Sequence, residues 1–191
     1  MIEIRIHGRG GQGNVVAAYL LATTAIEEGL YGQAFPAFGA ERRGAPVVAF
    51  TRIANAPIRR RSQVREPAYL IIQDQALMQI PGVTDGLRPG GKILVNSTRD
   101  SAALCAETGL EVVALPATSL ANQILGRPVP NTALLSAFLT LTELLPREAL
   151  VKSLAQRFKG AVLERNTHLI EEAARQVEAG CWKEADDAAS A

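Results

Sequence analysis

Residues 8–13 read GRGGQG, and this run could hold an anion. Gly8, Gly10 and Gly13 fit the pattern G-x-G-x-x-G between an expected strand and an expected helix. Glycine lets the backbone approach a ligand closely, and a helix N-terminus offers free N–H groups and the positive end of its dipole. The run therefore suits a pyrophosphate. The alternative is that the glycines only permit tight strand–helix packing or a close subunit contact.

The two best-known phosphate-binding patterns fit this run poorly. A dinucleotide site also needs an acidic residue at the end of a second strand, about 20 residues further on. Glu27 and Glu28 lie at about that distance, but at the end of an expected helix. A Walker motif needs Lys and then Ser or Thr after the last glycine, whereas Asn14 follows Gly13. A Walker site is excluded, and a NAD-dependent dehydrogenase is disfavoured.

Positive charge gathers between residues 42 and 65, a segment that we call the arginine block. It holds no acidic residue and seven arginines, namely Arg42, Arg43, Arg52, Arg59, Arg60, Arg61 and Arg65. Arginine is enriched at protein interfaces, and its planar guanidinium also suits phosphate and carboxylate. We rank an interface first, an anionic ligand second and nucleic acid last, because no aromatic residues are interleaved with the arginines. A solvated loop edge is the plainest alternative.

The segment before the arginine block is apolar for a loop. Residues 31–44 are interrupted by three glycines and a proline, which predicts a long loop without regular structure. Within it, Phe35 and Phe38 lie in the run FPAFGAERRGAP at 35–46. Apolar residues on a long irregular loop indicate a partner surface or a functional site. The alternative is that the two Phe side chains fold back onto the core.

The chain lacks the residue clusters that most enzymes use. Cys105 and Cys181 form no CxxC pair, which excludes a self-contained iron–sulfur cluster and a cysteine-built zinc site. His7 and His168 are too few for a His-rich metal site, and we expect neither to be a catalytic base. No G-x-S-x-G or H-E-x-x-H motif occurs. The sequence therefore predicts a binding and assembly module.

An α/β fold must position these features. Strands are expected at 2–6, 47–53, 69–74, 92–95 and 111–115, with one more near residue 58 in a hairpin with 47–53. Helices are expected at 15–26, 76–80 and 101–107, and almost throughout after residue 116. The alternation predicts a mostly parallel sheet, made mixed by the hairpin and covered on both faces, with a helical C-terminal part.

Length and composition set the remaining limits. The chain has 191 residues, of which 48% are hydrophobic, and this predicts one domain at 1–180 with a frayed tail at 181–191. A net charge of +1 argues against a strongly cationic nucleic-acid binder. No apolar run approaches the roughly 18 residues of a membrane span, and no signal peptide is evident. With two unpaired cysteines, these features are typical of a cytoplasmic protein without nucleic-acid or membrane partners.

Two segments together resemble a known family. GRGGQG at 8–13, paired with FPAFGAERRGAPVVAFTRI at 35–53, resembles the gamma subunit of 2-oxoacid:acceptor oxidoreductases such as pyruvate:ferredoxin oxidoreductase. The likeness continues through 58–67, the strand at 70–74 and Pro130-Asn131, and it reaches about residue 176. The motif ERRGAPV at 41–47 resembles pyruvate-type gamma subunits more than 2-oxoglutarate-type ones. The resemblance implies a three-layer Rossmann-like domain.

The resemblance also implies a role within a complex. Family members oxidatively decarboxylate a 2-oxoacid to an acyl-coenzyme A; pyruvate is the default, and aryl or branched-chain 2-oxoacids are the alternatives. Electrons pass to ferredoxin, or to NAD through a further subunit. Thiamine diphosphate with Mg and 4Fe–4S clusters lie in partner chains, which are alpha, beta and a ferredoxin-like delta subunit. This chain alone would hold no cofactor and would serve assembly and the handling of coenzyme A as co-substrate.

Site residues follow from the same resemblance. Those expected to face the diphosphate of coenzyme A are Gly8, Gly10, Gly11, Gln12 and Gly13. Arg42 and Arg43 would supply charge to its phosphates or to neighbouring chains. The competing hypothesis is a free-standing nucleotide- or coenzyme-A-binding module with a regulatory role, which would be stable alone and would need no partner.

Residues 35–46 are expected to form a main contact surface with the partner chains. Reversing two charges there, as in Arg42→Glu with Arg43→Glu, should weaken co-purification with those chains, because the new carboxylates remove the positive charge that an interface would use. The measurement is the yield of partner chains with the tagged variant after co-expression. An unchanged yield of partner chains would contradict this hypothesis.

Overall fold

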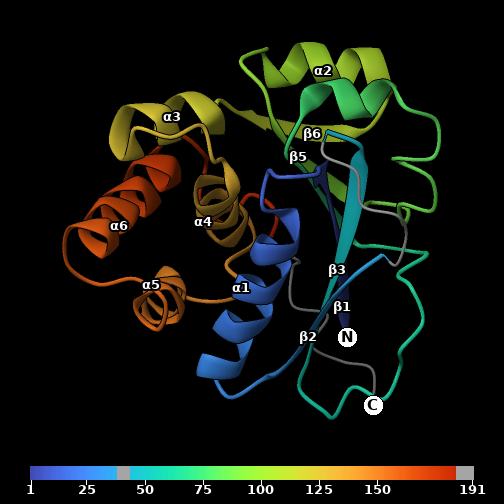
Figure 1. Ribbon diagram of the computed structural model, residues 1–191. Helices are drawn as coiled ribbons and strands as arrows, with labels where there is room; N and C mark the ends of the chain where they lie inside the picture. Colours follow the sequence, from blue (N-terminus) through green and yellow to red (C-terminus); the bar gives the residue numbers. More distant parts are fainter. Residues whose placement is uncertain (38–43, 184–191) are drawn as a thin grey trace.

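A six-stranded sheet forms the centre of the computed structural model, which describes residues 1–37 and 44–183 (Figure 1). The strands are β1 (Ile2–Arg9), β2 (Tyr31–Pro36), β3 (Pro46–Ala54), β4 (Tyr69–Ile72), β5 (Lys92–Asn96) and β6 (Glu111–Leu115). They lie in the order β2-β3-β1-β4-β5-β6. β3 is antiparallel to β1 and β2, whereas β1, β4, β5 and β6 pair in parallel. The sheet is therefore mostly parallel and mixed, as predicted.

Helices cover both faces of the sheet. They are α1 (Asn14–Glu27), the short 3₁₀ helix η1 (Gln75–Gln79), α2 (Ser101–Thr108), α3 (Ala117–Leu125), α4 (Asn131–Thr142), α5 (Arg147–Ala155) and α6 (Gly160–Arg175). Figure 1 shows α1 and α3–α6 on one face and α2 on the other. The three-layer α/β prediction and the helical C-terminal part are confirmed.

Each face of the sheet has its own apolar core. The larger core joins Ile6, Ile71 and Leu94 to α1, α4 and α6, and every residue of α4 is buried. The smaller core joins Ile72 and Val95 to η1 and α2. Because both faces are covered, β4 and β5 are continuous apolar runs without alternation, which is why the sequence predicts them well.

β1 has an apolar side and a polar side. Ile4 and Ile6 face the larger core, whereas Glu3, Arg5 and His7 alternate with them and face away from it. All three polar residues are nevertheless buried. Irregular segments close this half of the sheet in place of a helix, since Arg5 donates from Nη2 to the carbonyls of residues 83 and 85 at 2.9 and 2.7 Å.

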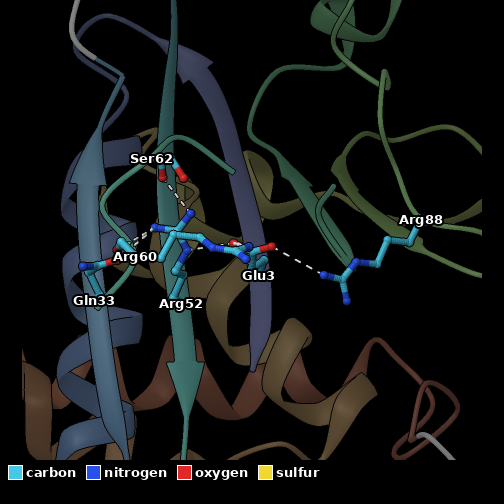
Figure 2. A network of polar contacts seen from close by, with 6 residues as sticks. All are labelled: Glu3, Gln33, Arg52, Arg60, Ser62 and Arg88. Carbon is cyan, nitrogen blue, oxygen red and sulfur yellow. Dashed lines mark hydrogen bonds and ion pairs between the residues drawn. The ribbon is translucent and has the colours of Figure 1, made fainter. Parts of the chain in front are cut away.

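A buried ion pair joins three strands on this polar side (Figure 2). Arg52 is 0% exposed and donates from Nε to Glu3 Oε1 at 2.7 Å. Its Nη1 donates to Gln33 of β2 at 3.0 Å, and its Nη2 donates to the carbonyl of Ser62 at 2.6 Å. Arg88 reaches the second oxygen of Glu3 at 3.4 Å. Every Arg52 nitrogen is thus used, and the segment after β3 is held against the sheet.

Two predictions about strands near the arginine block were wrong. Residues 31–36 form edge strand β2 and not a loop, so the antiparallel partner of β3 precedes it. Gly32 lies within this strand and does not interrupt it: a Cβ there would lie 2.2 Å from the carbonyl oxygen of Ala22 in α1, so the glycine permits close packing. Pro36 ends an edge strand, where proline is tolerated. No strand forms near Ile58 within the described residues.

The prediction of a frayed tail at 181–191 was wrong for its first residues. Trp182 is 3% exposed and stacks on Tyr69 with ring centroids 6.2 Å apart. Its N–H donates to the carbonyl of Leu141 at 2.8 Å. Residues 181–183 therefore belong to the packed domain, and 184–191 lie outside the described residues.

The ion pair between Arg52 and Glu3 can be tested by removing one or both partners. Arg52→Met should lower the free energy of unfolding by about 3–5 kcal/mol, because it leaves a buried carboxylate without its main partner. Glu3→Gln combined with Arg52→Met should cost clearly less, since no lone charge remains. Urea denaturation measures both.

Arg99→Met is the matched control, since Arg99 pairs with Glu107 on the surface and is 41% exposed. Its cost should stay within about 1 kcal/mol. An equal cost for all three variants would contradict a special role for the buried pair.

Candidate functional site

The candidate site is the turn from β1 into α1, which lies at the carboxyl end of the parallel strands. Gly8 is still part of β1 and lies opposite Val47 of β3. The chain then turns through Gly11, with φ at 94°, and Gly13, with φ at 77°. These are conformations that glycine adopts readily. The glycine run is therefore a tight strand-to-helix turn.

Two of the glycines also lie in close packing contacts. A Cβ on Gly13 would lie 3.0 Å from Nδ2 of Asn131, and one on Gly8 would lie 3.1 Å from Cβ of Asn14. A Cβ on Gly11 would meet no atom within 4 Å. Gly8 and Gly13 therefore serve close packing, whereas Gly11 faces open space.

Part of the turn is closed by the segment before β3. The N–H of Gly10 donates to the carbonyl of Ala45 at 2.9 Å, and the N–H of Gly44 donates to the carbonyl of Gly10 at 3.3 Å. The amide oxygen of Gln12 accepts from the N–H of Arg9 at 2.7 Å. These groups stabilise the turn and are already engaged within the protein.

The groups left for an anion lie at the start of α1. Within the described residues, the N–H groups of Gly11 and Gly13 have no acceptor. The first N–H groups of an α-helix also lack an intrahelical partner. α4 begins beside this point. The side chain of its first residue, Asn131, lies 3.0 Å from the position that a Cβ on Gly13 would occupy. Two helix N-termini thus bring positive dipole ends to one place.

An ion pair lies next to the turn, at the carboxyl ends of β1 and β4. Arg9 ends β1, Asp74 follows β4, and the guanidinium Nε pairs with Asp74 Oδ2. The strand order changes direction at β1: β3 and β2 lie on one side of it, and β4, β5 and β6 lie on the other. Open α/β sheets bind ligands at such a change of direction. Arg9 therefore places a half-exposed positive charge where a ligand would be expected.

Buried polar groups without hydrogen-bond partners among the described residues lie at the same end of β1 and β4. Gln73 is 1% exposed, and neither of its side-chain amide atoms has a hydrogen-bond partner among the described residues. His7 is 5% exposed and its Nε2 is likewise unpartnered. Burial, helped by the charge of Arg5, lowers the pKa of His7 to about 4. His7 is neutral near pH 7 and offers no positive charge to an anion.

The arginine block is not one surface. Arg42 and Arg43 lie outside the described residues. Arg52 was grouped with interface or ligand residues, but this is wrong because it is wholly buried in the ion pair with Glu3. The remaining members are exposed, and these are Arg59, Arg60, Arg61 and Arg65. Phe35, from the apolar segment before the block, packs against Phe50 of β3 with its ring tilted by 40° and the ring centroids 5.1 Å apart.

Sequence reasoning missed the residues that flank the glycine turn. Asp74 follows a buried strand, and the carboxyl ends of parallel strands share one edge of the sheet. The sequence could therefore have placed Asp74 near the glycine turn. Asn131 follows a proline at a helix start. The contact between Asn131 and Gly13 joins positions far apart in the sequence, and no local sequence pattern predicts it.

The described residues hold no metal site. No group of three or more His, Cys, Asp or Glu side chains in 1–37 and 44–183 could hold a metal ion. Both cysteines are free, and the thiol of Cys105 contacts the backbone of Val112. Within the same residues, no helix is long and apolar enough to cross a membrane.

Comparisons with known proteins agree with this architecture. The family model of pyruvate ferredoxin/flavodoxin oxidoreductase matches residues 3–176. The chain is 44% identical over 178 residues to pyruvate synthase subunit PorC of Methanothermobacter thermautotrophicus, covering 93% of this chain and 97% of the relative. It is 44% identical over 176 residues to the common gamma subunit of pyruvate/ketoisovalerate oxidoreductases of Thermococcus kodakarensis, covering 91% and 95%.

Solved structures show the same likeness. Pyruvate oxidoreductase subunit PORC of Thermotoga maritima superposes with a TM-score of 0.82 at 35% identity, covering 94% of this chain and 98% of that one. A 2-oxoglutarate:ferredoxin oxidoreductase of Magnetococcus marinus superposes with a TM-score of 0.76 at 19% identity, over 97% of this chain and 33% of that one. At that identity the second likeness shows the fold alone.

Fold, glycine turn and relatives together define a Rossmann-like gamma subunit of a 2-oxoacid oxidoreductase. The chain belongs to the pyruvate ferredoxin/flavodoxin oxidoreductase family. The resemblance seen in the sequence is therefore confirmed. A free-standing regulatory module finds no support among these relatives, which are named as subunits. A dehydrogenase-type NAD site is also disfavoured, because β2 ends at Pro36 and Ala37 follows where the acidic residue is needed.

The burial of His7 has a consequence for stability in mild acid. Between pH 6.5 and about 4, the unfolded chain binds a proton on this residue that the native chain does not bind. Stability therefore falls as the pH falls through this window, by up to about 3 kcal/mol from this residue. His7→Leu should remove that part of the loss, as measured by urea denaturation at a series of pH values.

His168→Leu is the control, because it makes the same substitution at an exposed position of α6 and keeps His7, so the acid loss due to His7 should persist. If His7→Leu shows the same acid dependence as the unsubstituted chain, His7 does not titrate as its burial requires.

Proposed function

We propose that this chain contributes the binding of coenzyme A to a pyruvate-oxidising complex, with the diphosphate held at residues 8–13. The observation that carries the proposal is the pair of unengaged N–H groups, on Gly11 and Gly13, beside two helix N-termini and the guanidinium of Arg9. Backbone N–H groups and a nearby cation are what a diphosphate needs. Gly8, Gly10 and Gln12 then shape the turn, and Gly11 and Gly13 face the ligand.

Pyruvate is the proposed 2-oxoacid, with branched-chain or aryl 2-oxoacids as alternatives. Two kinds of relatives support this range, since one is named a pyruvate synthase subunit and the other serves pyruvate and ketoisovalerate oxidoreductases in common. A gamma chain shared between two substrates indicates that substrate choice is made elsewhere in the complex. The product is the acyl-coenzyme A, and the acceptor is ferredoxin or an NAD-reducing subunit.

The redox chemistry is assigned to partner chains in a cytoplasmic complex. Thiamine diphosphate with Mg and 4Fe–4S clusters would be held by alpha, beta and ferredoxin-like delta subunits. The described residues of this chain offer no cluster of metal ligands, which supports that division. Arg42 and Arg43 would supply charge to the phosphates of coenzyme A or to a neighbouring chain. The chain's own task is then to bind and orient the thiol-bearing co-substrate.

Coenzyme A binding is tested by adding a negative charge to the glycine turn. In Gly11→Glu, repulsion of the diphosphate should raise the KM for coenzyme A in the assembled complex at least about tenfold, or about 1.4 kcal/mol. The kcat at saturating coenzyme A should change little, since the residue touches no reacting atom. Steady-state kinetics with pyruvate and ferredoxin give both values.

Gly109→Glu is the matched control. Gly109 ends α2 with φ at 68°, and like Gly11 it is exposed with open space around a Cβ. Both variants place a glutamate at a position with positive φ and add the same charge, at different places. A KM that is unchanged in Gly11→Glu, or raised equally in Gly109→Glu, contradicts binding at the turn.

A further inference from the structure

An apolar groove opens between α1, the link from α3 to α4, and the start of α6. Its apolar walls come from Val16, Leu20, Leu125, Val129, Phe158 and Val162. The groove has a volume of about 300 Å³. It lies outside the glycine turn, on the outward side of α1.

The walls of this groove are unusually exposed for apolar side chains. Val162 is 52% exposed, Val16 is 40% exposed and Phe158 is 37% exposed. Tyr19, one turn further along α1, is 43% exposed and extends the stripe beyond the groove. Grouped exposed apolar residues mark interaction surfaces, whereas scattered ones do not. Exposed apolar side chains both in the groove and beside it on α1 favour a protein segment as the occupant.

The rim of the groove carries unpaired positive charge. Arg127 and Arg165 line the groove, and Arg157 and Lys159 flank Phe158. All four are exposed, and none pairs with an acidic group among the described residues. The rim therefore complements acidic groups on whatever covers the groove.

The floor of the groove is fixed by internal hydrogen bonds. Thr132 donates from Oγ1 to Oδ1 of Asn166 at 3.3 Å, and Asn166 donates from Nδ2 to the carbonyl of Val162 at 2.8 Å. Both side chains are buried. Because these polar groups satisfy each other, the groove offers an incoming segment mainly its apolar walls and basic rim.

We propose that this groove docks a segment of another subunit of the complex, with an apolar side chain as its anchor and acidic residues beside it. A second copy of this chain fits poorly, because a symmetric contact would bring the same unpaired arginines together. The proposal rests on the chain acting as a subunit, but not on its binding coenzyme A. It assigns to the complex a contact separate from residues 35–46.

The groove is tested by a double substitution with a matched control. Val162→Asp with Arg165→Glu should weaken capture of the purified alpha, beta and delta chains at least about tenfold, because it removes the anchor site and reverses the rim. Ile80→Asp with Arg99→Glu makes the same changes at η1 and before α2, at exposed positions elsewhere on the surface. This control should stay within about twofold of the unsubstituted chain. Thermal unfolding checks that each variant is folded.

The location of the contact is tested with a benzoylphenylalanine photo-crosslinker in place of Val162. We expect a cross-link to an acidic segment of another subunit, identified by mass spectrometry. Cross-links to a second copy only, equal capture by both double variants, or binding to phosphatidylserine vesicles that the groove variant abolishes would each overturn the proposal.

Failure of the groove can be told apart from failure of the proposed function. If the unsubstituted chain captures no partner subunit, both the groove and the subunit role fall. If it captures them and the groove variant does so equally, only the groove proposal falls. The KM for coenzyme A, measured at concentrations where the groove variant is assembled, should equal that of the unsubstituted complex.

Discussion

The buried ion pair between Glu3 and Arg52 replaces, on one half of the sheet, the apolar layer that helices provide elsewhere. A charged pair removed from water is costly unless its other hydrogen-bonding positions are filled. Here Gln33 and the backbone of Ser62 fill those of Arg52. The price of burial is therefore offset by contacts that fix β2, β3 and the segment after β3. An apolar layer could cover this half of the sheet as well. We therefore infer that the ion pair serves to specify one arrangement of β1, β2 and β3.

β1 depends on this arrangement because it serves two environments at once. Its Ile side chains complete the larger core, and its polar side chains lie under the irregular segments. The strand must therefore be held in a single register, and the ladder to β3 runs from Ile2 to Arg9 without interruption. A one-residue slip would turn Glu3 and Arg5 toward the helical core in place of Ile4 and Ile6, and would bury charge there. The fixed register is also what delivers Gly8 and Arg9 to the edge of the sheet.

The sequence predicts most of this fold where its signal is local. The apolar runs of β4, β5 and β6 and the strand–glycine–helix junction are continuous in the chain, and the structure confirms them. β2 was missed because the reason for Gly32 lies in Ala22 of a neighbouring helix. Arg52 was misjudged because its partner, Glu3, lies 49 residues away. A count of arginines cannot show which of them a distant carboxylate will bury.

α1 links the two surfaces that the molecule offers. The glycine turn leads directly into its first residue, Asn14, and Val16 in its first turn lines the apolar groove. The start of α4 lies beside the glycine turn and the groove. Its first residue, Asn131, packs against Gly13 and also lines the groove. A segment seated in the groove would therefore lie against the two helices whose starts frame the anion site. In this arrangement, the contact with a partner subunit and the anion site are built on the same pair of helices.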